Sequence, residues 1–213
     1  MAKHIYKYII YLICVLFITQ GCQQKPKNVD VINGYESIVE KLEDAIKYEI
    51  ENKNLNAISM AIVDDQQIIW AKGFGYEDPE HQINADAQTI YRVGSVSKLF
   101  TDMAIMQKVE SGEIDLDAPI QTYLPDFTPN NPYDKPITLR QLMSHRSGLL
   151  REPSEGNYFA DDEVSLKATV ESIVPSTLIH EPESKTKYSN AAIAVVGYTL
   201  EYLYKTPYVE YMQ

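Results

Sequence analysis

Cysteine is scarce in this sequence of 213 residues, which contains only Cys14 and Cys22. Cys14 lies within an apolar run near the N-terminus, so a chain that begins at Cys22 keeps a single thiol. Such a chain cannot form an intramolecular disulfide. The rest of the composition is ordinary for a globular protein, with 45% hydrophobic and 10% aromatic residues, and the length allows one or two domains.

Positive charge is also in short supply, with 19 basic residues against 30 acidic ones and a net charge of -11. Binding to nucleic acid requires clustered lysine and arginine against the phosphates, so nucleic acid is excluded as a partner. The acidic residues are spread over many stretches, and this distribution predicts solubility rather than one particular partner.

The N-terminal apolar run, Tyr8 to Thr19, is shorter than the ~20 residues that a membrane-spanning helix needs. Lys3 and Lys7 precede it and give the positive flank of a signal peptide. The run is followed by Thr19-Gln20-Gly21-Cys22, which resembles a bacterial lipobox apart from Gln20, where a small residue is usual. A plain secretory signal and a short uncleaved anchor are the alternatives.

We therefore predict a lipoprotein signal peptide over residues 1–21 and lipidation of Cys22, which would hold the protein on the membrane outside the cytoplasm, in the periplasm or at the cell surface. Residues 22–34 are polar, and they are predicted to form a flexible tether. Residues 35–213 are predicted to form the folded domain.

That domain shows neither an internal repeat nor a low-complexity tract, and its pattern is α+β. Apolar residues recur at helical spacing from Ile38 to Ile50. Two strand-like runs, Ala57 to Val63 and Gln67 to Gly75, then predict an antiparallel hairpin that ends at a glycine. A mainly helical block follows. It holds an amphipathic helix from Ser95, a short helix capped by Thr138 and a helix from about Ala191 towards Tyr204.

The first motif with chemical meaning is Ser95-Val96-Ser97-Lys98, which fits the pattern Ser-x-x-Lys. The pattern alone is weak, because Ser184 to Lys187 fits it too. Only Ser95 follows a glycine turn and opens an amphipathic helix, which would place Lys98 one turn along on the same face. A serine hydroxyl needs a base to become a good nucleophile, and a neighbouring amine can serve as that base or stabilise another.

The second motif is Tyr188-Ser189-Asn190, in which Tyr188 is the only one of 16 tyrosines with asparagine two positions later. A phenol becomes a usable base when nearby cations favour its phenolate. Taken alone, a Tyr-x-Asn sequence is more often a packed ring and a turn.

Together these motifs resemble the serine β-lactamase and penicillin-binding-protein superfamily, in the branch that uses a tyrosine. That branch includes class C β-lactamases, D-alanyl-D-alanine carboxypeptidases and related esterases and peptidases. Further phrases resemble the family in the expected order: Tyr91 to Ser95, Gly112 to Pro119, Tyr123 to Asp126 and Ile137 to Leu149.

The resemblance implies a β-lactamase/transpeptidase-like fold, an antiparallel sheet with helices plus a mainly helical subdomain. It implies Ser95 as the acyl-enzyme nucleophile with its N–H as an oxyanion donor, Lys98 as its proton partner and Tyr188 as the general base. Asn190 is implied as a contact to substrate or to Lys98. His145 is implied as a support of the cleft wall, and we reject a Ser-His-Asp triad. No cofactor is expected, and His81 and His180 lack partners at metal-binding spacing.

Two departures from the family pattern stand out. The usual Pro-Gly turn before the tyrosine motif reads Pro182-Glu183. The third family motif, on a sheet strand, would lie beyond Gln213, so we expect the C-terminal sheet strands to be missing and the chain to be an inactive fragment.

The predicted function is a serine hydrolase that acts on a small-molecule or peptide acyl substrate outside the cytoplasm. Whether that substrate is a β-lactam, a peptide or an ester stays open. The alternative is a non-catalytic surface lipoprotein that uses the same fold for binding.

Overall fold

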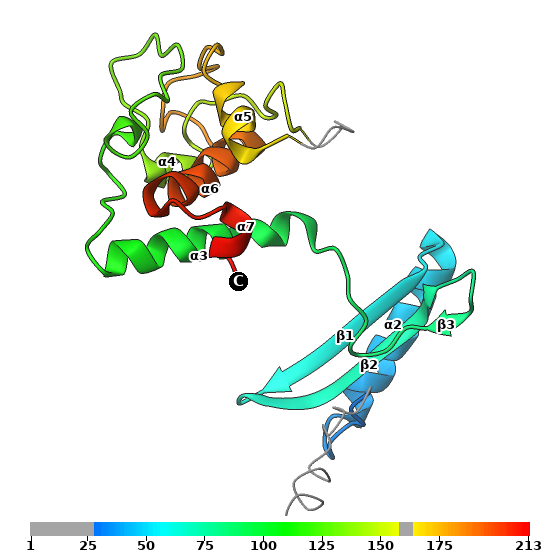
Figure 1. Ribbon diagram of the computed structural model, residues 1–213. Coiled ribbons are helices and arrows are strands. Elements are labelled where there is room, and N and C mark those ends of the chain that lie inside the picture. The colour runs from blue at the N-terminus through cyan, green and yellow to red at the C-terminus, as the bar shows by residue number, and fades with distance from the viewer. Residues whose placement is uncertain (1–27, 158–163) are drawn as a thin grey trace, which may run out of the picture. The chain divides into compact units, whose positions relative to one another are not determined.

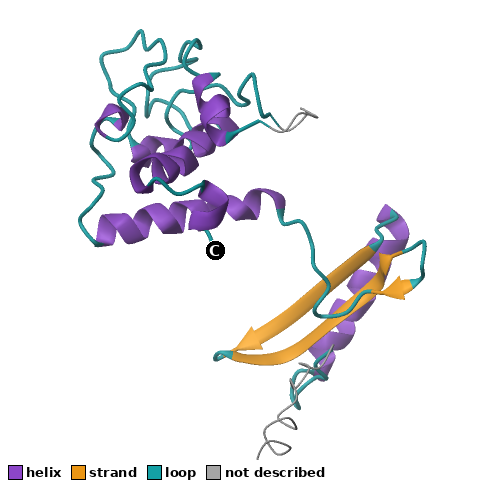
Figure 2. Cartoon of the chain, in the orientation of Figure 1, coloured by secondary structure: helices purple, strands orange, loops and turns teal. Residues whose placement is uncertain are grey.

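The computed structural model describes residues 28–157 and 164–213, and the chain divides into two compact units (Figures 1 and 2). The N-terminal unit ends at Arg92 and the C-terminal unit begins at Val93. The predicted signal peptide and the lipidation site at Cys22 lie outside the described residues. The elements are α2 (Glu36–Lys53), β1 (Ala57–Asp64), β2 (Gln67–Asp78), β3 (Ile83–Asn84), η1 (Gly94–Val96), α3 (Ser97–Glu110), η2 (Ile120–Thr122), α4 (Leu139–Met143), α5 (Leu166–Glu171), α6 (Asn190–Tyr204) and α7 (Tyr208–Tyr211).

The N-terminal unit packs α2 on an antiparallel sheet with strand order β1-β2-β3, which confirms the predicted helix and hairpin. Asp65 and Gln66 form the hairpin turn, with φ values of 43° and 65°. Two successive left-handed residues give a turn whose twist matches that of the paired strands. Where α2 packs against the sheet, its spaced apolar residues Val39 and Ile46 are buried with Trp70 of β2.

The second strand is longer than predicted, because β2 continues past Gly75 to Asp78. Gly75 has a φ of +76°, and a Cβ there would lie 2.2 Å from the carbonyl oxygen of Asn56. This glycine therefore permits a close approach of backbone inside the sheet instead of ending the strand.

The described part of the predicted tether, residues 28–34, is held against the sheet. Val29 exchanges two backbone hydrogen bonds with Ala71, of 2.8 and 3.0 Å, and the Ile32 N–H donates to Ile69 at 3.1 Å. This stretch therefore pairs with β2 in the structure, whereas its composition predicted a tether. Polar composition suggested a loop, but main-chain hydrogen bonding to an open strand edge does not depend on side-chain polarity.

The C-terminal unit is built around α6, which contacts α3, α4, α5 and α7. Figure 1 shows α6 lying against α3, with α4 and α5 close by. Val195, Val196 and Leu200 of α6 are fully buried in the largest apolar core of the described residues. Apolar residues between Ala191 and Leu203 lie on most sides of α6, as expected for a helix that packs against several neighbours.

One face of α3 joins this core. The buried residues of α3 are Thr101, Ala104 and Ile105, whereas Leu99 and Met103 stay exposed. Residues three and four positions apart share a helix face, so contact with α6 selects the Thr101 face.

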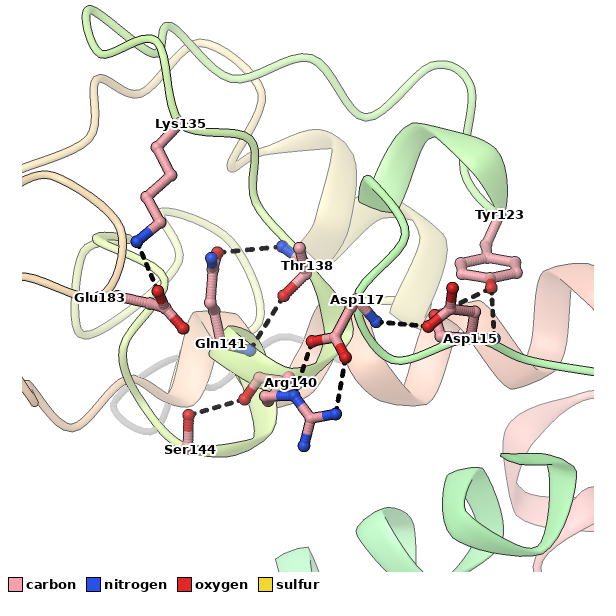
Figure 3. Close-up of polar contacts among 9 residues, drawn as sticks. All are labelled: Asp115, Asp117, Tyr123, Lys135, Thr138, Arg140, Gln141, Ser144 and Glu183. Atoms are coloured by element: carbon pink, nitrogen blue, oxygen red, sulfur yellow. Dashed lines mark hydrogen bonds and ion pairs between the residues drawn. The ribbon is translucent and has the colours of Figure 1, made fainter. Parts of the chain in front are cut away.

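Polar contacts fix the loops that connect these helices (Figure 3). Thr138 caps α4 as predicted, in a capping box: its hydroxyl accepts from the Gln141 N–H, and the Gln141 side chain accepts from the Thr138 N–H at 3.0 Å. Arg140 binds both carboxylate oxygens of Asp117, at 2.6 and 2.8 Å. The architecture is α+β with a mainly helical second part, as predicted.

Candidate active site

Ser95 lies on η1, the single 3-10 turn that leads directly into α3. The α-helix itself begins at Ser97, two residues later than predicted. The 3-10 turn before it makes the chain helical from Gly94 to Glu110. Lys98 is one turn further on, and its ammonium donates a hydrogen bond of 3.1 Å to Ser95 Oγ. The helical spacing thus brings together the hydroxyl and the amine of the first motif.

Tyr188 reaches the same serine from 93 positions away in the sequence. Its phenol hydroxyl donates to Ser95 Oγ at 2.7 Å, and Lys98 Nζ lies 5.1 Å from the centre of the tyrosine ring. Tyr188 lies in the loop, two residues before α6 begins. The side chain of Ser189 caps the first turn of that helix. The N-cap therefore fixes the backbone next to the phenol.

The surroundings of Tyr188 change its acidity. Partial burial pushes the pKa of the phenol up, but hydrogen bonds with Lys98 and Ser95, together with the charges of Lys98 and Arg151, outweigh it. The net pKa of Tyr188 lies below its ordinary value of 10.0. The Arg151 guanidinium lies 5.5 Å from the ring centre. Nearby cations favour the charged form of an acid, so the phenolate is more accessible here than in free tyrosine.

His145 packs against this tyrosine, with 4.3 Å between the two ring centres. Its Nδ1 accepts a hydrogen bond of 3.3 Å from the Ser189 N–H. Burial and then the charge of Lys98 lower the pKa of His145 below its ordinary value, which favours the neutral form of the ring. The geometry suits a residue that positions Tyr188.

The turn after His145 requires its glycine. Gly148 has a φ of +82°, and a Cβ there would lie 2.2 Å from the His180 carbonyl oxygen. The turn also binds the loop that leads to Tyr188, because the Lys187 N–H donates to the His145 carbonyl at 2.8 Å. The turn from His145 to Gly148 therefore supports the loop that carries Tyr188, and it does not supply the nucleophile.

The departure at Pro182-Glu183 leaves this loop in place. Glu183 adopts a φ of 66°, in the left-handed region that glycine occupies without strain. Its N–H donates to the Arg146 carbonyl at 2.7 Å, and its carboxylate pairs with Lys135 (Figure 3). Glutamate in place of the usual glycine therefore strains one backbone torsion, but Tyr188 still lies beside Ser95.

Asn190 is the first residue of α6, and its backbone N–H donates to the Arg151 carbonyl at 2.7 Å. Its side-chain amide donates to Glu152 Oε1 at 2.7 Å. Sequence reasoning missed Glu152 and Arg151. The one available signal was their place in the chain, directly after the distinctive phrase that ends near Leu149.

A pocket of about 270 Å³ lies beside Ser95. It is lined by Gly94, Ser95, Lys98, Glu152, Pro153, Gly156, Thr169, Asn190 and Ala194. Across the described stretches 28–157 and 164–213, no group of three or more His, Cys, Asp or Glu side chains could hold a metal ion. Within the same stretches, no helix has the length and apolarity to cross a membrane.

The arrangement is suited to nucleophilic chemistry. A hydroxyl touches both an amine and a phenol of lowered pKa, so its proton has an acceptor within hydrogen-bonding distance as the oxygen attacks. The pocket beside it can receive the group that the serine would attack.

Known proteins are similar to this chain in sequence and in fold. "Beta-lactamase-like protein 2" of Dictyostelium discoideum is 31% identical over 218 residues, covering 96% of this chain and 39% of that protein. The solved structure of EstCE1, titled a hydrolase with promiscuous acyltransferase activity, has a TM-score of 0.75 at 26% identity, covering 83% of this chain and 50% of that one. A penicillin-binding protein homologue from Pyrococcus abyssi, described as octameric, has a TM-score of 0.70 at 28% identity, with coverage of 82% and 41%.

The chain therefore spans about half or less of the length of these relatives. The likeness confirms the predicted β-lactamase/transpeptidase-like fold. The sequence profile of the family described as Beta-lactamase matches residues 42–213, which is well over half of the chain. On this match, the protein belongs to the Beta-lactamase family, a family of hydrolases.

Proposed function

We propose that the protein is a serine hydrolase that transfers an acyl group to water through an acyl-enzyme on Ser95. The observation that carries this proposal is the double contact of Ser95 Oγ with Lys98 Nζ and the Tyr188 hydroxyl. A purely structural serine has no need of two such partners at the mouth of a pocket.

In the first half of the reaction, Ser95 Oγ attacks the substrate's carbonyl carbon while its proton passes to the Tyr188 phenolate, which Lys98 stabilises. The Ser95 N–H helps to hold the oxyanion. The bond to the leaving nitrogen or oxygen then breaks, and Tyr188 returns the proton to that atom. In the second half, Tyr188 removes a proton from water and the water oxygen attacks the acyl-enzyme ester. The bond between the acyl carbon and Ser95 Oγ then breaks, and Tyr188 returns the proton to Oγ, which regenerates the serine and releases the acid.

The substrate that we propose is a small peptide, ester or β-lactam. The names of the similar proteins support this range, since one is a hydrolase with acyltransferase activity and another a penicillin-binding protein homologue. Asn190 contributes a polar contact to the substrate, because it lines the pocket beside Ser95. Because the relatives are about twice as long or longer, we propose that activity requires more than residues 1–213.

We also propose that the protein works outside the cytoplasm, anchored by a lipid on Cys22. The lipobox-like sequence after the apolar run supports this location. Membrane fractionation of cells expressing the full-length protein and its Cys22→Ala variant tests it. The anchored protein is expected in the membrane fraction and the variant outside it, while equal distribution of the two would rule out the anchor.

The function is tested by treating the full-length protein with a fluorophosphonate or a labelled penicillin. Covalent label is expected on the protein and is expected to disappear in Ser95→Ala. Ser184→Ala is the matched control, since it removes a serine from the other Ser-x-x-Lys sequence. Absence of label in the folded wild-type protein would favour the non-catalytic binding function.

A further inference from the structure

The pocket beside Ser95 contains one acidic side chain, that of Glu152, among the residues that line it. The same lining carries the positive charge of Lys98 and the polar amide of Asn190. A carboxylate so near a nucleophile needs an explanation, because the nucleophilic step described above makes no use of it.

The two oxygens of this carboxylate differ in their surroundings. Oε1 accepts the Asn190 amide at 2.7 Å and lies 3.3 Å from Arg151 Nε. Oε2 is buried from solvent and has no hydrogen-bond partner among the residues that the structure describes. A buried carboxylate oxygen without a donor is costly, so such a group either is compensated by a ligand or signals strain.

The existing partners hold the carboxylate in place without saturating it. Asn190 is fixed by the start of α6, so its amide sets the orientation of Oε1. Arg151 is a weaker partner, because 66% of its side chain is exposed and its ion pair is screened by water. The Glu152 side chain itself is only 23% exposed. The pocket that holds the nucleophile is therefore also lined by a carboxylate whose negative charge is only partly compensated.

We propose that Glu152 binds the ammonium group of the substrate, so that the enzyme prefers acyl groups bearing a free amine, such as aminoacyl amides and esters. The ammonium pairs with the Glu152 carboxylate while the adjacent carbonyl faces Ser95 Oγ. A pocket of about 270 Å³ suits a short aminoacyl group of this kind. This inference rests on the proposed serine hydrolase function and names a substrate class for it.

The test compares three substrates on the full-length protein: alanine p-nitroanilide, its N-acetyl derivative and propionic p-nitroanilide, which lacks the amine, with both alanine enantiomers measured. In wild type, kcat/KM is expected to be highest for one enantiomer of the free-amine substrate. Glu152→Gln keeps an acceptor for Asn190 but removes the charge. It is expected to lower kcat/KM for the free amine about 10- to 100-fold, the worth of a hydrogen bond to a charged group, and to leave the other two substrates unchanged.

Glu155→Gln is the matched control, because Glu155 is an exposed acid in the same loop that does not line the pocket. It is expected to leave all rates unchanged. The preference for the free amine is also expected to fade as the pH rises above the amine pKa, near 8 for an α-amino group.

Labelling of Ser95 by a fluorophosphonate separates the two proposals. Equal labelling of wild type and Glu152→Gln, with no preference for the free amine, would overturn the role of Glu152 and leave the hydrolase function standing. An equal fall in the rates for all three substrates would assign Glu152 a purely structural role and overturn the inference. Failure of wild type to label would remove the hydrolase function and this inference with it.

Discussion

The chain contains two Ser-x-x-Lys sequences, and their surroundings differ sharply. In the first, Ser95 and Lys98 lie on one face of a continuous helical segment with 3.1 Å between Oγ and Nζ. In the second, Ser184 lies in a turn and donates its hydroxyl to the Glu181 carbonyl at 2.6 Å, while Lys187 is exposed in the extended loop that follows. The spacing has chemical meaning only where the backbone is helical, because only there do residues three apart share a face.

The largest expected effect separates the two lysines. Lys98→Met keeps the length of the side chain but removes the charge that contacts Ser95 and favours the Tyr188 phenolate. The rate of Ser95 labelling is expected to fall towards the upper end of the about 10²- to 10⁴-fold range of acid–base catalysis. Lys187→Met is the matched control and is expected to label at the wild-type rate. Similar losses in both variants would break the comparison.

Tyr188→Phe sharpens the same comparison, since it removes the second partner of Ser95 and leaves the lysine in place. The ring can still pack on His145, so the fold is expected to survive. Because Lys98 can take over part of the proton transfer, the loss of labelling rate is expected near the lower end of the same range, about 10²-fold. An unchanged rate, measured with folding checked by circular dichroism, would show that the phenol has no part in activating the serine.

The pH dependence of labelling tests the electrostatics of Tyr188. A base acts when deprotonated, so the rate is expected to rise with pH through a midpoint below 10.0, because the pKa of Tyr188 is lowered. Arg151→Ala removes a cation that favours the phenolate and is expected to move this midpoint to higher pH. A midpoint that falls or stays fixed in this variant would assign the titration to another group.

The smallest expected effect concerns the scaffold of the second loop. Thr138 caps α4, the helix that leads into the His145 turn and so to the backbone of Lys187. Thr138→Ala is expected to lower the free energy of unfolding by about 1 kcal/mol, measured by denaturant titration, because it removes the cap. The labelling rate of the folded protein should stay within about twofold, and a much larger drop would make the cap part of the site itself.

The sequence predicted the long elements because their signals are local. Helical spacing identified α2, and Thr138 identified the start of α4. The short helix α5 and the two-residue strand β3 escaped prediction, since neither is long enough to show a period. The extension of β2 also escaped, because Gly75 signals a strand end when its close neighbour Asn56 is unknown.

In the site, too, residues with a local sequence signal were predicted, and a residue that depends on tertiary contacts was missed. Ser95 and Lys98 follow from helix geometry, and Tyr188 was chosen from its local sequence and the family resemblance. The roles of these residues stay predictions. Glu152 could not have been chosen in this way. It is distinguished by a contact with Asn190, 38 positions later, and by an oxygen that has no donor in the described part of the chain. Such features depend on how two loops meet.

The contact of Ser95 with Tyr188 has a consequence for how the protein can be followed in solution. The two oxygens are 2.7 Å apart but 93 positions apart in the chain, so closing that span carries an entropic cost that only the assembled helices offset. An unfolded chain would hold a serine of ordinary, sluggish reactivity. The rate at which Ser95 reacts with an electrophile therefore also reports whether these distant segments have come together.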